Sequence, residues 1–177
     1  MARAMRFRWL VVGGLVAGGL WGAELALAQP VSAPLATELA ELMSSRQLEA
    51  VAGKDSIDAD RFVAALAFPG QLLVVSARYE VPVYLEQKIA DGKFRDVYID
   101  LNAASIAGTR VLVTDAGANG LNADDNAVDM FDAGAGMLRL DGKWRAQNLS
   151  EDDYRKAAAD ADSQYARMLT ALINQVR

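Results

Sequence analysis

The stretch QLLVVSARY, residues 71–79, is a continuous apolar run rich in β-branched residues. It follows a Pro-Gly pair at positions 69–70 and leads into charged residues, and its length is typical of a strand rather than a helix. A strand that is apolar at successive positions has both of its faces buried. The stretch therefore predicts a strand in the centre of a sheet.

The C-terminal segment, residues 150–176, carries a long helical pattern. Asp153 follows Ser150 at the spacing of a capping box, which marks a helix start. Beyond it, apolar residues recur at spacings of three and four, namely Tyr154, Ala158, Ala161, Tyr165, Met168, Leu172 and Val176. A stripe of this kind faces the core of a globular domain. We expect one long amphipathic helix packed on the sheet.

The N-terminal part of the domain is predicted to be helical. A first helix opens at Pro34, since proline suits the first helical position. A second, short helix carries Leu48 and Val51. A third begins with Asp58 as its cap and stops at the Pro-Gly pair, residues 69–70.

The rest of the chain predicts a short helix and several strands. The helix covers residues 82–91, and the strands cover residues 94–101, 109–115 and 127–131, followed by a hairpin over 136–144 that turns at Asp141-Gly142. Helices, a strand, a helix, several strands and a long helix follow one another in this order. The order is typical of an α+β fold with a mostly antiparallel sheet of about five strands.

The first 28 residues have the pattern of a secretory signal peptide. Three arginines precede an apolar run at residues 9–21, and the segment ends in Ala26-Leu27-Ala28. The apolar run has 13 residues, fewer than the roughly 20 that a membrane-spanning helix needs. We expect cleavage after Ala28, which leaves a single domain over residues 29–177 in the periplasm or outside the cell.

The composition excludes several classes of function. The sequence contains no cysteine and no histidine, which excludes disulfides, Cys/His zinc sites and catalytic groups built on a thiol or an imidazole. Loss of the first 28 residues removes three arginines and Glu24, so the formal net charge changes from −5 to −7. An acidic chain disfavours binding to nucleic acid or to anionic membranes.

The acidic stretch TDAGANGLNADDNAVDMFD, residues 114–132, is a candidate metal site. It does not fit an EF-hand, because Gly117 and Ala123 stand at positions three and nine of the loop, and Asn126 stands at position twelve, where the bidentate glutamate belongs. A looser calcium site remains open, with oxygen ligands from Asp115, Asn119, Asn122, Asp124, Asp125 and Asp129. The alternative is a solvated connection, because Asp and Asn are ordinary residues of turns.

A second candidate site is an anion-binding group at the end of the central strand, formed by Ser76, Arg78 and Tyr79. An arginine next to a tyrosine can hold an anionic ligand by forked hydrogen bonds and stacking. A flavin is one such ligand, since a flavin-binding split barrel has a similar order of elements. The alternative is an ion pair between Arg78 and a neighbouring acidic residue.

No catalytic arrangement is recognisable in the sequence. Asp96 and Asp100 lie on one predicted strand, but residues four apart on a strand are separated by about 13 Å, too far to act together on one bond. The leading interpretation is a non-catalytic binding or accessory domain whose partner is a small molecule or a protein. The alternatives are an anionic-ligand binder and a weak calcium-binding module.

The signal-peptide interpretation predicts the start of the exported protein. Signal peptidase should remove residues 1–28, because the small residues Ala26 and Ala28 fit its recognition site. N-terminal sequencing of the exported protein should therefore begin at Gln29. A protein that starts at Met1 and stays in the membrane fraction would instead be anchored.

Overall fold

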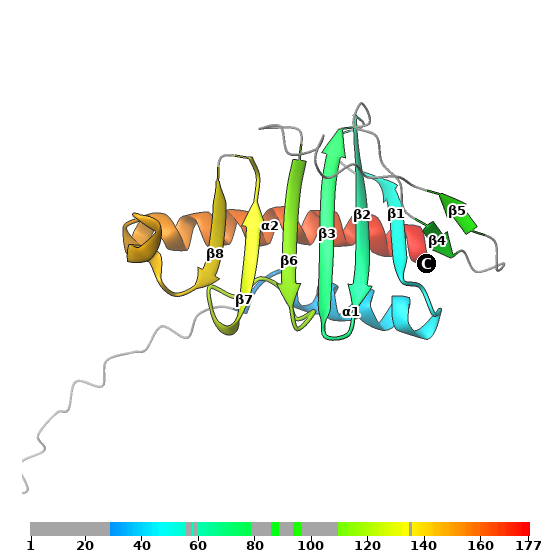
Figure 1. Ribbon diagram of the computed structural model, residues 1–177, viewed down its shortest axis with the longest axis horizontal. Helices are drawn as coiled ribbons and strands as arrows, with labels where there is room; N and C mark the ends of the chain where they lie inside the picture. Colours follow the sequence, from blue (N-terminus) through cyan, green and yellow to red (C-terminus); the bar gives the residue numbers. More distant parts are fainter. Residues whose placement is uncertain are drawn as a thin grey trace, which may run out of the picture.

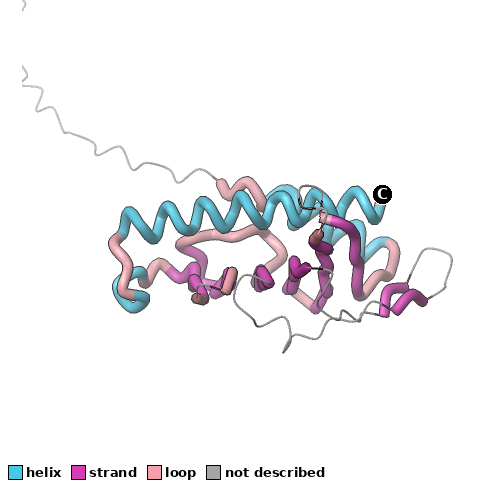
Figure 2. The backbone as a smooth tube through the Cα atoms, turned by 90° about the horizontal axis from the view of Figure 1, so that it is seen from above, coloured by secondary structure: helices cyan, strands magenta, loops and turns pink. Residues whose placement is uncertain are grey.

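Two helices cover one face of an antiparallel sheet (Figure 1, Figure 2). The computed structural model describes residues 29–55, 58, 60–78, 86–88, 94–96, 110–134 and 136–177. Helices α1 (Ala33–Ser45) and α2 (Glu151–Val176) form one layer, and the strands form the other. The predicted α+β class, with a long C-terminal helix packed on an antiparallel sheet, is confirmed.

The main sheet has six strands in the order β1-β2-β3-β6-β7-β8, and every neighbouring pair is antiparallel. Its strands are β1 (Ala50–Lys54), β2 (Arg61–Phe68), β3 (Gln71–Arg78), β6 (Arg110–Ala116), β7 (Asp124–Asp132) and β8 (Met137–Asp141). Strands β4 (Glu86–Lys88) and β5 (Phe94–Asp96) form a separate pair. In the described part of the chain this sheet is open, with β1 and β8 at its ends.

Strand β3 is central, as the apolar run at residues 71–79 predicts. It lies between β2 and β6. Leu72 and Val74 belong to the core between the sheet and the helices, whereas Val75 and Ala77 belong to a smaller apolar cluster on the opposite face. Because successive side chains on a strand point to opposite faces, the unbroken apolar run serves both cores.

The second and third helices predicted in the N-terminal part are wrong, since residues 50–54 and 61–68 form β1 and β2. Phe62 and Leu66 lie on one face of β2 and Val63 and Ala65 on the other, and three of these four are buried. A strand buried on both faces shows no alternation of apolar and polar residues, so the pattern does not distinguish it from a helix. Pairing with β1 and β3 then outweighs the helix propensity of its alanines.

Three predicted turns or helices also differ from the structure. Pro69-Gly70 ends no helix but turns the chain between β2 and β3, with Gly70 at φ +72°. The predicted hairpin at Asp141-Gly142 is wrong, because the chain enters a short 3-10 helix, η2 (Trp144–Gln147), and then α2. The helix predicted over residues 82–91 is wrong at 86–88, which form β4, and its other residues lie outside the described part.

Helix α2 crosses the whole sheet. Its N-terminus is capped as predicted, since Asp153 donates its backbone N–H to Ser150 Oγ at 3.1 Å. Tyr154, near this end, donates its hydroxyl to the Ala123 carbonyl at 2.7 Å, and Gln175, near the other end, packs beside Gly53 of β1. Among the described residues, neither helix is both long and apolar enough to span a bilayer.

Helix α1 packs beside the C-terminal half of α2. Leu39 and Met43 are fully buried in the shared core. Arg46 donates to the Val176 carbonyl, and Arg177 forms an ion pair with Glu38. These contacts fix the end of α2 to the middle and to the C-terminal end of the shorter helix.

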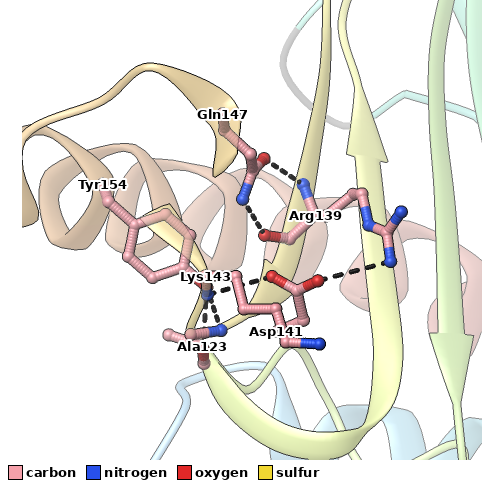
Figure 3. A network of polar contacts seen from close by, with 7 residues as sticks. Ala123, Arg139, Asp141, Lys143, Gln147 and Tyr154 are labelled. Atoms are coloured by element: carbon pink, nitrogen blue, oxygen red, sulfur yellow. Dashed lines mark hydrogen bonds and ion pairs between the residues drawn. The ribbon is translucent and has the colours of Figure 1, made fainter. Parts of the chain in front are cut away.

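Strand β8 lies at the edge of the described sheet, and a side chain forms hydrogen bonds with its outer backbone groups (Figure 3). Gln147 Oε1 accepts the Arg139 backbone N–H at 2.8 Å, and Gln147 Nε2 donates to the Arg139 carbonyl at 2.8 Å. Asp141, two residues further along this strand, forms an ion pair with Arg139. A covered and charged edge resists pairing with a second chain.

The start of the domain is tied to α2 and to the loop after β6. Asp162 of α2 accepts the backbone N–H groups of Val31 at 2.6 Å and Ser32 at 3.1 Å. Ser32 Oγ accepts the Leu121 N–H at 2.9 Å. Gly120 has φ +85°, and a Cβ atom there would lie 2.5 Å from backbone atoms of Ala33.

The close approach at Gly120 predicts a destabilising substitution. Gly120→Ala should lower the free energy of unfolding, because the added methyl group forces the start of α1 away from the loop. Gly70→Ala is the matched control, since Gly70 has a similar φ of +72° but no atom near the added Cβ. Strain in the left-handed region, about 1–2 kcal/mol, is common to both, and Gly120→Ala should cost about 1–3 kcal/mol more. Urea denaturation measures this difference, and equal losses would contradict the close packing.

Candidate functional site

A cavity of about 300 Å³ lies between the sheet and α2. Its polar lining consists of Asp55, Asp58, Arg61, Ser76, Gln164 and Arg167. Val111 of β6 and Met168 of α2 add apolar surface. Four separate elements and the turn after β1 thus contribute to one concave site, which makes it the leading candidate for ligand binding.

The position of the cavity follows from the placement of the two helices. Helix α1 lies near the end of the sheet where the chain turns from β2 to β3 (Figure 1). Arg61, Ser76 and Val111 lie at the opposite end, where β2 and β6 begin and β3 ends. The helix-facing side of the sheet is therefore shared between α2 and the cavity at this end.

Arg61 is oriented by two hydrogen bonds to Ser76. Its Nε donates to Ser76 Oγ at 3.0 Å, and one Nη donates to the Ser76 carbonyl at 3.0 Å. Ser76 is buried and Arg61 is half-buried. Three further N–H groups of the guanidinium can donate to a ligand, since an arginine has about five in all.

Two other arginines lie near this group. Arg78 is directly opposite Arg61 in the β2–β3 pairing and is exposed, so the two side chains share the face of the sheet that α2 covers. Arg167 projects from α2 and lines the cavity. Within the described part of the chain, neither Arg61 nor Arg167 belongs to an ion pair.

The predicted anion-binding group is only partly assembled at this cavity. Ser76 lines it, but its hydroxyl accepts a hydrogen bond from Arg61. Arg78 follows in the same strand but is not a lining residue, and Tyr79 lies outside the described residues. Arg61 was missed because its segment was assigned to a helix. Had the Pro-Gly pair been interpreted as a hairpin turn, antiparallel pairing would have placed Arg61 opposite Arg78.

The acidic stretch serves the backbone of its own loop. Asp115 accepts the N–H groups of Asn119 at 3.1 Å and Gly120 at 3.0 Å. Asp129 accepts the N–H groups of Ala116 at 2.8 Å and Asn122 at 3.0 Å. Both aspartates are fully buried. These two carboxylates bring together residues that flank the loop and fold it against the helices.

The backbone hydrogen bonds of this loop engage two of the six predicted calcium ligands. The carboxylates of Asp115 and Asp129 are occupied by N–H donors, and among the described residues no group of three or more acidic side chains could hold a metal ion. Asn119 is exposed and Asn122 is half-buried. The backbone of Asp124 and Asp125 is part of β7, but their side chains lie outside what is described.

Burial is the largest influence on the pKa of Asp115 and on that of its hydrogen-bond partner, Tyr165. Tyr165 of α2 donates its hydroxyl to Asp115 Oδ2 at 3.0 Å. Desolvation raises the pKa of Asp115 above 3.8, although hydrogen bonds from Gly120, Asn119 and Tyr165 oppose the shift. Burial and the negative charge of Asp115 raise the pKa of Tyr165 well above 10. The tyrosine therefore remains a hydrogen-bond donor at neutral pH.

A second cavity of about 300 Å³ lies where the chain enters the domain, between residues 29–31, the loop after β6 and α2. Its charged lining residues are Arg155, which pairs with Glu151, and Asp162, which holds the N–H groups of Val31 and Ser32. Both charges already have partners, so this cavity is a weaker candidate for ligand binding.

Comparison of the chain with protein-family models, with curated proteins and with solved structures found no match in any of the three.

The Tyr165–Asp115 contact predicts a change in stability and in its pH dependence. Tyr165→Phe should lower the free energy of unfolding at pH 7 by about 1–3 kcal/mol, because Asp115 stays buried with one donor fewer. In the native protein the raised pKa of Tyr165 contributes stability that is complete below about pH 10 and falls above it, since the unfolded tyrosine ionises first. The variant should lose less stability between pH 10 and 11 than the native protein, as measured by denaturant unfolding. An unchanged alkaline slope would contradict the assigned titration.

Proposed function

We propose that the protein is an exported, non-catalytic binding domain that holds a small ligand with an anionic group in the cavity between the sheet and α2. The observation that carries the proposal is that Arg61 and Arg167 line this cavity from opposite layers, and neither has an ionic partner among the described residues. Guanidinium groups suit carboxylates and phosphates, which they bind with paired hydrogen bonds.

The hydrogen bonds at Arg61 support a site that is formed before the ligand arrives. Two bonds to Ser76 fix the orientation of its guanidinium, so little side-chain freedom is lost when a ligand binds. The half-buried position of Arg61 also lowers the local dielectric constant, which strengthens its attraction to an anion. Arg78 lies directly across the β2–β3 pair, and the repulsion between these two arginines is relieved by a nearby negative charge.

The size of the cavity favours a small ligand over a flavin. The cavity has a volume of about 300 Å³. That volume is at the lower limit of ligand pockets. An amino acid, a short dicarboxylate or a similarly small metabolite fits this limit, whereas an isoalloxazine ring with its phosphorylated chain is larger.

The role of Ser76 supports binding rather than catalysis. A nucleophilic serine donates its proton to a base, but Ser76 Oγ accepts a hydrogen bond from the cationic Arg61. The sequence offers no histidine to act as that base. Export rests on the N-terminal pattern, and the backbone N–H groups of Val31 and Ser32, just beyond the proposed cleavage site, donate to Asp162 of α2.

The proposed function predicts that glutarate binds in the cavity through Arg167. Arg167→Gln should weaken binding by about tenfold, because the loss of one charge-assisted hydrogen bond amounts to about 1.5 kcal/mol. Arg167 is exposed, so the substitution should leave the melting temperature almost unchanged. Isothermal titration calorimetry at constant ionic strength measures the affinity.

Lys156→Gln is the matched control, because it removes the same charge from an exposed position of α2 that does not line the cavity. Its affinity for glutarate should equal that of the native protein. If glutarate and inorganic phosphate both fail to bind, or if the two variants lose affinity equally, the cavity is not an anion site.

A further inference from the structure

The loop after β6 contains the one Asn-Gly pair of the sequence, Asn119-Gly120. Asparagine is chemically labile, and a following glycine, which has no Cβ, leaves the most room for the next backbone nitrogen to attack the side-chain amide. We propose that Asn119 is a deamidation site that the closed loop protects, so that the reaction proceeds only when the loop opens and then keeps it open. This inference concerns a different part of the protein from the ligand cavity and does not rest on the proposed function.

Deamidation at this pair needs only the chain itself and water. The Gly120 nitrogen forms a bond to Asn119 Cγ, the bond from Cγ to Nδ2 breaks, and ammonia leaves with the proton of the Gly120 N–H. Water then opens the resulting cyclic succinimide at either of its carbonyl groups. The products are aspartate and isoaspartate. In isoaspartate the main chain runs through the side-chain carbons and is one carbon longer.

The closed loop holds the attacking nitrogen on a buried carboxylate. The Gly120 N–H donates to Asp115 Oδ2 at 3.0 Å, and the Asn119 N–H donates to Asp115 Oδ1 at 3.1 Å. Attack requires the Gly120 nitrogen to lose its proton. Because Asp115 is fully buried, a second negative charge on that nitrogen would be poorly screened from the carboxylate. The contact with Asp115 therefore opposes the reaction.

Packing also opposes the movement that closes the ring. Gly120 is buried with φ +85°, and a Cβ atom there would lie 2.5 Å from backbone atoms of Ala33. The Asn119 side chain lies beside Gly117, since a Cβ atom added at Gly117 would be 3.2 Å from Asn119 Cγ. Ring closure must bring this Cγ atom to the Gly120 nitrogen, which turns the peptide group between the two residues. The close contact with the start of α1 leaves little room for that turn.

The reaction therefore needs the loop to separate from the start of α1. Ser32 Oγ accepts the Leu121 N–H at 2.9 Å, and both residues are buried. Folded proteins open locally, with free energies smaller than that of global unfolding. Asn119 is already exposed, so the loss of the contacts at residues 120 and 121 is the step that permits attack. The rate of deamidation in the folded protein then reports the fraction of molecules whose loop is open.

The isoaspartate product cannot restore the closed loop. Its longer main chain shifts the N–H groups of residues 119 and 120 relative to each other, so they no longer match the two oxygens of Asp115. Deamidation also adds a negative charge to a residue whose N–H contacts that buried carboxylate, and like charges at short range repel. One chemical event thus makes a reversible opening permanent and loosens the start of α1.

Peptide mass spectrometry measures isoaspartate at residue 119 after the purified protein is incubated at mildly alkaline pH, once in buffer and once in guanidinium chloride. The denatured protein should form it at least about tenfold faster, because the folded protein reacts only through its open fraction. Asn119→Gln should abolish the product at this position, since the longer side chain closes a ring much less readily. Hydrogen exchange of the Gly120 N–H measures opening independently, and its protection factor should be of the same order as the ratio of the two rates.

Ser32→Ala should accelerate deamidation in the folded protein by about tenfold, because the buried Leu121 N–H loses its acceptor and the loop opens more often. Ser45→Ala is the matched control, since Ser45 is exposed at the end of α1 and its hydroxyl donates to the Leu42 carbonyl of the same helix. It should keep the rate of the native protein. In guanidinium chloride all three proteins should react equally fast, because their Asn-Gly pair is the same.

Equal rates in buffer and in guanidinium chloride would overturn the inference, as would a denatured protein that forms no isoaspartate at residue 119. An unchanged rate in folded Ser32→Ala would also overturn it, and the melting temperature checks that this variant folds. If it does not fold, the comparison of hydrogen exchange with deamidation in the native protein decides. A protection factor that differs from the ratio of rates by orders of magnitude would then show that opening of this loop does not control the reaction.

Discussion

The structure depends on buried carboxylates that take their hydrogen bonds from the backbone. Asp115 and Asp129 accept four N–H groups of the segment 116–122, and Ser32 accepts a fifth. A buried N–H without a partner costs about 1–3 kcal/mol. The connection between β6 and β7 could not lie against α1 and α2 if these groups were unsatisfied, so the acidic residues determine its path.

The same interactions decide where the helices lie. The loop presents Leu121 to Ser32 and Gly120 to Ala33, and Asp162 of α2 holds the residues just before α1. These contacts place α1 at the end of the sheet where β2 turns into β3. The opposite strand ends, with Arg61 and Ser76, are then left to face α2 across a cavity. A set of buried polar contacts at one end of the sheet thus determines where the cavity opens at the other end.

The elements that were predictable from the sequence are those with one strong local pattern. The central strand, the first helix and α2 with its Ser150 cap each follow from residues within a single segment. Strands β1 and β2 were not predictable in this way, because alanines and apolar residues on both faces produce no period of two. Only the pairing with β3, which is not local, makes these segments strands.

The candidate site was predictable only in part for the same reason. Ser76 and Arg78 follow from the end of the central strand, but Arg61, Asp55 and Arg167 come from segments far apart in sequence. Arg167 lies on the polar side of a helical pattern, where a charged residue carries no signal of function. The acidic stretch was conspicuous because its aspartates lie within one segment of the sequence that has no basic residue. The charges of the cavity are instead brought together by the fold.

The two groups of aspartates show why composition alone cannot assign a role to a carboxylate. Asp115 and Asp55 are the same residue type in an acidic chain, yet Asp115 is fully buried with three donors at known distances, and Asp55 lines a cavity. Burial removes water from Asp115 and thereby raises its pKa. The charge of this carboxylate is therefore stabilised by hydrogen bonds from the chain itself. Asp55 is half-exposed and lines a cavity together with two arginines, so solvent and neighbouring positive charge also stabilise its carboxylate. The position of each carboxylate relative to backbone donors, rather than the number of acidic residues, therefore separates the part of the protein that maintains the fold from the part that lines the cavity.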